Sequence, residues 1–159
     1  MSLRHSLLSG LLLTLLVSLP ARAELQDFDQ HTLPAIEKDL AGEPFLLLLW
    51  SVHCAPCIAE LKALSDVIND PALPPVVMVA TDPAGMAEEV DLVLADHGLD
   101  AVAGWRFADP LPERLRYVID PDWYGELPRS YFYAADGTRE AHSGRLTRER
   151  LLAWIAAQQ

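Results

Sequence analysis

Cysteine is scarce in this chain, which holds only two, Cys54 and Cys57, among its 159 residues. A structural zinc site normally takes four ligands from cysteine and histidine. No second cysteine pair is present, and the five histidines are scattered along the chain, which argues against such a site. The Cys-Ala-Pro-Cys spacing instead predicts a redox-active dithiol, with an ordinary structural disulfide as the alternative.

Basic residues are also few, since 12 Lys and Arg stand against 23 Asp and Glu and give a formal net charge of −11. No basic stretch is available to neutralise phosphates, so we expect no nucleic-acid partner. The acidic residues are spread along the chain, a pattern typical of a solvated, soluble surface.

The N-terminal apolar run, Leu7 to Leu19, is too short for a membrane span of about 20 residues. Arg4 precedes it and Ala21-Arg22-Ala23 follows, as in a secretory signal peptide with an A-x-A cleavage site. We therefore expect residues 1–23 to be a signal peptide and residues 24–159 to form a single periplasmic domain. An uncleaved N-terminal anchor is the alternative.

The two cysteines lie where a buried strand should meet a helix. Phe45 to Trp50 is a continuous apolar run, and Ile58 to Ile68 has apolar residues at helical spacing. Cys54 then lies at the helix N-terminus, where unpaired N–H groups and the helix dipole lower a thiol pKa. We expect Cys54 to be the exposed attacking thiol and Cys57 the resolving thiol, with Pro56 fitting the first helical turn.

Strand and helix patterns alternate along the rest of the chain, which predicts an α/β fold with a central mixed sheet flanked by helices. Residues 24–30 are interpreted as a polar lead-in, and residues 105–107 as a short extended segment. Helices are expected over 33–40 (capped by Thr32), from Thr81 to about His97, over 110–119 (capped by Asp109), and after Thr147. Strands are expected at 76–80, 131–134 and 138–143, the last two joined by an Asp136-Gly137 hairpin turn.

Four features of the sequence together make the chain resemble the thioredoxin superfamily, and more closely its exported TlpA/ResA-like thiol–disulfide oxidoreductases. An apolar strand ends in Trp50 and leads into the cysteine pair, and Glu60 lies three residues after the second cysteine. Leu127-Pro128 precedes a strand, and the Asp136-Gly137 hairpin leads to a C-terminal helix. The resemblance implies a three-layer thioredoxin-like fold over residues 24–159.

The resemblance also implies roles for several residues near the cysteines. Cys54 would be the nucleophile, Cys57 the resolving thiol, and Trp50 a supporting residue. Pro128 would be a cis proline packed against the disulfide, leaving the backbone of Leu127 free to pair with a partner strand. An ordinary trans turn proline is the alternative, and a cis bond before proline costs only about 0.5–1 kcal/mol.

Two further side chains depend on their surroundings. Glu60 matches an acidic residue of ResA-like proteins and could exchange a proton with Cys57, or it could be a solvated surface glutamate. Ordinary thioredoxins instead bury an aspartate six residues before the first cysteine, where this chain has Leu48. His53 replaces the tryptophan usual before the first cysteine. A protonated imidazole there would stabilise the Cys54 thiolate, and an exposed, inert loop side chain is the alternative.

These observations favour a periplasmic thiol–disulfide oxidoreductase that reduces disulfides in exported proteins, such as apocytochromes or copper-site proteins. We expect a monomer recharged by a membrane thiol-reductant donor, with no cofactor besides the Cys54–Cys57 disulfide and no resident metal. An oxidase or isomerase using the same pair is one alternative. A Cu(I)-binding, metallochaperone-like protein using Cys54, Cys57 and His53 is another, and a scaffold with incidental cysteines is a third.

Overall fold

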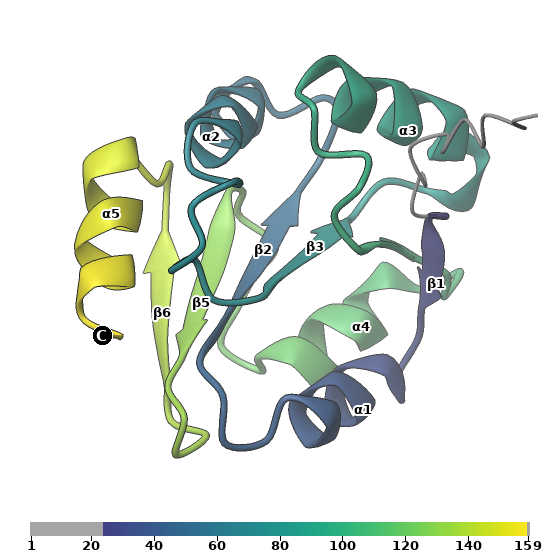
Figure 1. The fold of residues 1–159 in the computed structure, drawn as a ribbon. Helices are drawn as coiled ribbons and strands as arrows, with labels where there is room; N and C mark the ends of the chain where they lie inside the picture. The colour runs from purple at the N-terminus through teal and green to yellow at the C-terminus, as the bar shows by residue number, and fades with distance from the viewer. Residues whose placement is uncertain (1–23, 159) are drawn as a thin grey trace, which may run out of the picture.

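A six-stranded mixed sheet forms the middle layer of the computed structural model, which describes residues 24–158 (Figure 1). The strand order is β1-β4-β3-β2-β5-β6. Strands β1 to β4 are mutually parallel, β5 pairs antiparallel with β2, and β6 pairs antiparallel with β5. Their bounds are β1 Gln26–Phe28, β2 Phe45–Trp50, β3 Val76–Ala80, β4 Gly104–Phe107, β5 Arg129–Tyr133 and β6 Arg139–Ser143. The predicted mixed-sheet α/β fold is confirmed, and the predicted signal peptide lies outside the described residues.

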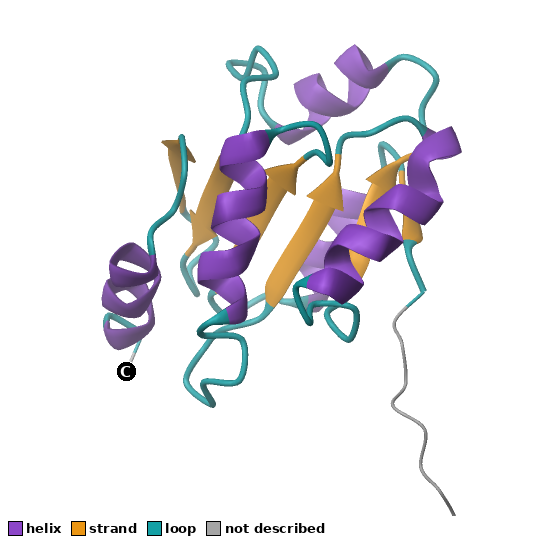
Figure 2. Cartoon of the chain, turned by 90° about the horizontal axis from the view of Figure 1, so that it is seen from above, coloured by secondary structure: helices purple, strands orange, loops and turns teal. Residues whose placement is uncertain are grey.

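Helices cover both faces of the sheet and complete the three layers (Figure 2). Helices α2, α3 and α5 pack on one face, and α1 and α4 on the other. Their bounds are α1 Thr32–Asp39, α2 Ala55–Ser65, α3 Ala87–Asp96, α4 Pro112–Ile119 and α5 Arg148–Ala156, with a short 3₁₀ helix, η1, at Ala84–Met86. Within residues 24–158, none of the helices combines the length and apolarity that crossing a membrane requires.

Strand β2 occupies the centre of the sheet because every one of its residues is apolar and can be buried. It pairs in parallel with β3 and antiparallel with β5. Alternate side chains enter the two opposite cores, which are Leu46, Leu48 and Trp50 on the α2 side, and Phe45, Leu47 and Leu49 on the α1 side. The strand predicted from the apolar run is thus confirmed with the same bounds.

The N-terminal strand β1 was not predicted, because only one of its three residues is buried. Phe28 is fully buried and its ring stacks on Phe107 at 5.9 Å between centroids. Arg106 also makes an ion pair with Asp27 at 2.7 Å. A strand with a single inward side chain shows no apolar alternation, so sequence periodicity could not reveal it.

Helix starts were predicted less accurately than strands. The prediction of Thr32 as a cap is wrong, since α1 begins at Thr32 and the Asp29 carboxylate accepts from its hydroxyl. The helix expected after Asp109 begins later, at Pro112, while Asp109 accepts from the Leu111 N–H. Thr147 is confirmed as the cap of α5, because its hydroxyl oxygen accepts from a backbone N–H inside the helix.

Helix α5 offers a matched test of which apolar residues support the sheet. Leu151 is fully buried, whereas its neighbour Leu152 is only half-buried. Leu151→Ala should lower the free energy of unfolding by about 2–5 kcal/mol, and Leu152→Ala by clearly less, as measured by urea denaturation. Equal losses for the two variants would contradict this packing of α5.

Candidate active site

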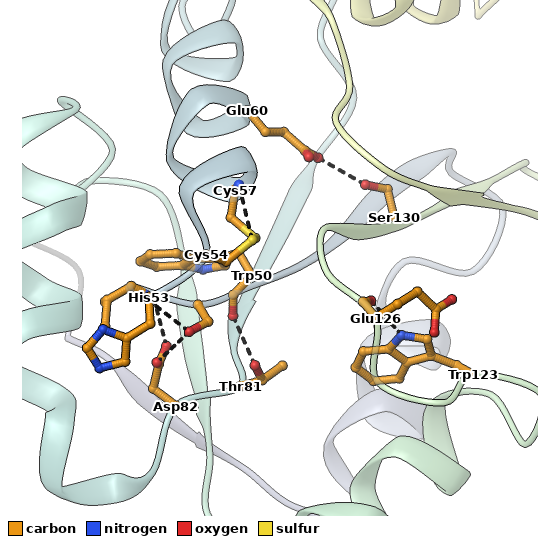
Figure 3. Close-up of a disulfide and its surroundings, with 12 residues drawn as sticks. Trp50, His53, Cys54, Cys57, Glu60, Thr81, Asp82, Trp123, Glu126 and Ser130 are labelled. Atoms are coloured by element: carbon orange, nitrogen blue, oxygen red, sulfur yellow. Dashed lines mark hydrogen bonds between the residues drawn. A yellow bond between two sulfur atoms is a disulfide. The ribbon is translucent and has the colours of Figure 1, made fainter.

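The Cys54–Cys57 disulfide lies at the junction of β2 and α2 (Figure 3). Cys54 is the N-cap of α2, with an extended backbone, and the Cα atoms of the two cysteines are 5.1 Å apart. Cys54 is half-buried, whereas Cys57 is fully buried. Only the first sulfur is therefore accessible to another protein, in agreement with the order expected for an attacking and a resolving thiol.

The start of helix α2 also provides a hydrogen bond for the exposed sulfur. The backbone N–H of Cys57 points at Cys54 Sγ, with a nitrogen–sulfur distance of 3.2 Å. Pro56 lies in the first turn, where it removes no helical hydrogen bond. In the reduced protein the same N–H and the helix dipole would stabilise a thiolate on Cys54.

The peptide bond between Leu127 and Pro128 is cis, as the resemblance implied. Pro128 is buried, and its carbonyl accepts from the Gly144 N–H at 3.0 Å. Leu127 is half-buried and packs against both cores of the sheet. Packing of Pro128 on the disulfide and pairing of Leu127 with a partner strand stay predictions.

A polar network holds the segment that leads to the cis proline. Arg129 makes an ion pair with Asp120 at 2.9 Å, and both side chains are almost covered. Tyr131 donates to the same carboxylate at 2.8 Å, and Trp123 donates to the Glu126 carbonyl at 2.9 Å. Burial is the largest influence and raises the pKa of Asp120, but hydrogen bonds from Tyr131, a backbone N–H and Arg129 together hold it below the usual value.

Glu60 is fully buried on α2, so the alternative of a solvated surface glutamate is wrong. Its Oε1 accepts from the Ser130 hydroxyl on β5 at 3.1 Å, while Oε2 makes no hydrogen bond of good geometry within the described residues. Burial raises the pKa of Glu60 to about 7, against smaller opposing effects of the Leu146 backbone N–H, Ser130 and the positive charge of Arg145. Residues three apart share one side of a helix, so this carboxyl group lies one turn from Cys57.

Asp82 is a buried acid at the start of the helix that the sequence predicts from Thr81. It is 4% exposed and follows strand β3. Its two oxygens accept from the Ser51 hydroxyl at 2.7 Å and from the Val52 N–H at 3.1 Å. An acidic residue just after a parallel strand was a usable signal, because the carboxyl ends of neighbouring parallel strands meet at one sheet edge.

His53 and Trp50 have contrasting environments beside the cysteines. His53 is exposed, and within residues 24–158 its imidazole makes no hydrogen bond or ion pair; only its backbone N–H donates, to Ser51 Oγ at 3.2 Å. The role of His53 beside the Cys54 thiolate stays a prediction. Trp50 is buried in the core on the α2 side. No group of three or more His, Cys, Asp or Glu side chains is arranged to hold a metal ion in the described part of the chain.

Solved structures of disulfide oxidoreductases share this chain path. A secreted disulfide oxidoreductase of Mycobacterium tuberculosis, homologous to E. coli DsbE, has a TM-score of 0.61 at 24% identity over 76% of this chain and 85% of its own. A thioredoxin-family thiol:disulfide interchange protein of Chlorobium tepidum gives 0.61 at 17% identity over 77% and 83%. The chain has a thioredoxin-like fold.

StoA of Bacillus subtilis shares this thioredoxin-like fold at a TM-score of 0.56, with 18% identity over 72% of this chain and 83% of its own. No family model and no curated protein matches the sequence. At these identities the likeness establishes the fold, which confirms the architecture that the resemblance implied.

The pH dependence of stability tests the environment of Glu60 in the oxidised protein, in which the cysteines do not titrate. Its folded pKa of about 7 lies above the ordinary 4.5, so its contribution is full below pH 4.5 and is lost as the pH rises through 7. The shift corresponds to about 3 kcal/mol. Between these pH values, the free energy of unfolding of the wild type should fall by that amount relative to Glu60→Gln. A difference independent of pH, measured by urea denaturation, would contradict the raised pKa.

Proposed function

We propose that this protein is a periplasmic thiol–disulfide oxidoreductase that reduces disulfides in exported proteins. The observation that carries the proposal is the asymmetric disulfide at the start of α2, with Cys54 accessible and Cys57 buried. The thioredoxin-like fold, shared with solved structures of disulfide oxidoreductases, supports the proposal.

The reaction transfers two electrons from the reduced pair to the substrate. The Cys54 thiolate attacks one sulfur of a substrate disulfide, forming a mixed disulfide and releasing the other sulfur as a thiolate, which takes up a proton. Cys57 then loses its proton and attacks Cys54 Sγ. This step forms the Cys54–Cys57 disulfide and releases the second substrate sulfur as a thiolate, which is protonated in turn.

Glu60 is the base that fits the second step. A carboxylate with a pKa near 7 can both accept and return a proton at neutral pH. It lies one helical turn from Cys57, and both side chains are fully buried, so water has little access to that thiol. When ionised, Glu60 also disfavours a second negative charge on Cys57, which shifts the equilibrium toward the disulfide and makes the dithiol a better reductant.

The cis proline provides a site for the substrate backbone. Pro128 has no N–H, and the Arg129–Asp120 ion pair holds the segment beside it in place. An extended substrate segment could therefore pair with the backbone of Leu127, as in strand addition at a sheet edge.

Export is supported by the predicted signal peptide over residues 1–23 and by the secreted M. tuberculosis neighbour. In an oxidising compartment the pair must be re-reduced after each turnover, and we propose a membrane thiol-reductant donor for this step. Apocytochromes and copper-site proteins are the substrates that we propose, and a monomer suffices because Cys54, Cys57 and Glu60 all lie on one helix and its cap.

Trapping of the mixed disulfide tests the assigned roles. We expect Cys57→Ser, whose Cys54 cannot be released, to accumulate a covalent adduct with a peptide containing one disulfide, visible as an added mass. Cys54→Ser should form almost no adduct, because the remaining thiol is buried.

The wild type serves as the control and should reduce the same peptide without accumulating an adduct. An adduct formed equally well by Cys54→Ser would reverse the assignment of the two thiols. The absence of any adduct in both variants would contradict the oxidoreductase function.

A further inference from the structure

A buried carboxylate just after β3 accepts hydrogen bonds from the loop that carries the nucleophile (Figure 3). Asp82 is 4% exposed, and its two oxygens accept from the Ser51 hydroxyl at 2.7 Å and the Val52 N–H at 3.1 Å. Burying a carboxylate is costly unless it is hydrogen-bonded. Both of these bonds lead to the loop between β2 and Cys54.

The hydrogen bonds continue from this loop to the cysteine itself. Ser51 Oγ accepts from the His53 N–H at 3.2 Å, and the Ser51 carbonyl accepts from the Cys54 N–H at 3.1 Å. Three consecutive backbone N–H groups, those of residues 52–54, are thus satisfied by Ser51 and Asp82. Since Cys54 is the N-cap of α2, this loop sets the direction of its sulfur relative to the Cys57 N–H.

We propose that Asp82 is a positioning residue for the reaction, which through Ser51 holds Cys54 in the N-cap conformation and so keeps its thiol reactive. The inference rests on the proposed function of Cys54 as the attacking thiol. It concerns a residue in the segment after β3, which contacts the loop but not the reacting sulfur.

The network uses both acceptor oxygens of the Asp82 carboxylate. Asp82 accepts one hydrogen bond on each oxygen, whereas asparagine has a single acceptor oxygen. In Asp82→Asn the amide N–H would therefore face either the Val52 N–H, which cannot accept it, or Ser51 Oγ, whose own proton then loses its acceptor. Ser51→Ala removes the same link without changing any charge, and Ser51→Thr retains the hydroxyl.

Alkylation of Cys54 measures this positioning directly. In a Cys57→Ser background Cys54 is the single thiol, so the pH profile of its alkylation reports its pKa and its reactivity. We expect Ser51→Ala and Asp82→Asn each to slow alkylation at neutral pH about tenfold, as a displaced reacting group does, and Ser51→Thr to restore most of the rate. Removing the Asp82 charge would by itself favour the thiolate and speed alkylation, so a slower rate identifies positioning as the cause.

A matched control and a double variant sharpen the test. Asp109 lines the same hollow of about 310 Å³ as Asp82, but its carboxylate accepts from the Leu111 N–H and not from the loop before Cys54. Cys54 should therefore be alkylated in Asp109→Asn at the same rate as in the background without this substitution. Ser51→Ala combined with Asp82→Asn should be no slower than the slower single variant, because both act in one network.

The positioning role would be overturned if Ser51→Ala and Asp82→Asn both kept the wild-type alkylation rate and pH profile of Cys54. Faster alkylation of Cys54 in Asp82→Asn would overturn it as well. Should Asp82→Asn fail to fold, the comparison of Ser51→Ala with Ser51→Thr still decides. Failure of the proposed function is distinguishable, since Cys54 would then form no mixed disulfide even in the background with an intact loop.

Discussion

Burial of strand β2 on both faces is the constraint on which the rest of this structure depends. Six consecutive apolar residues, Phe45–Trp50, fix the strand at the centre of the sheet between β3 and β5. The chain must leave the core at Ser51, and helix α2 begins four residues later. The cysteine pair therefore lies at an edge where two neighbouring strands can each supply a side chain.

Those neighbouring strands give the two sulfurs different surroundings. From the β3 side, Asp82 binds the loop before the half-buried Cys54. From the β5 side, Ser130 holds Glu60, which lies one helical turn from the buried Cys57. Ser130 also stands opposite Leu48 in the sheet, the position at which ordinary thioredoxins carry a buried aspartate. In this protein the buried carboxyl group of Glu60 thus reaches the same region from helix α2 instead of from the central strand.

The sequence predicted the parts of the site that depend on local pattern or on family resemblance. The position of Cys54 at a helix start and the cis bond before Pro128 are both confirmed. The sequence left the burial of Glu60 open. Its position on α2 is nevertheless on the same side of the helix as the buried Leu61 and Leu64. Asp82 was not assigned from the sequence. Its place after a predicted parallel strand was a signal, but its bonds to the Ser51 hydroxyl and the Val52 N–H join separate segments of the chain, and no local pattern contains them.

The equilibrium reduction potential of the Cys54–Cys57 pair at neutral pH, measured by thiol trapping across a series of dithiol buffers, tests the central claim most directly. Within residues 24–158 the His53 imidazole makes no hydrogen bond or ion pair, and an ionised Glu60 disfavours a thiolate on Cys57, one helical turn away. The account therefore predicts a value near or below that of thioredoxin, about −270 mV. A value near the strongly oxidising end of the scale, about −120 mV, would contradict a reductase and identify the pair as an oxidant.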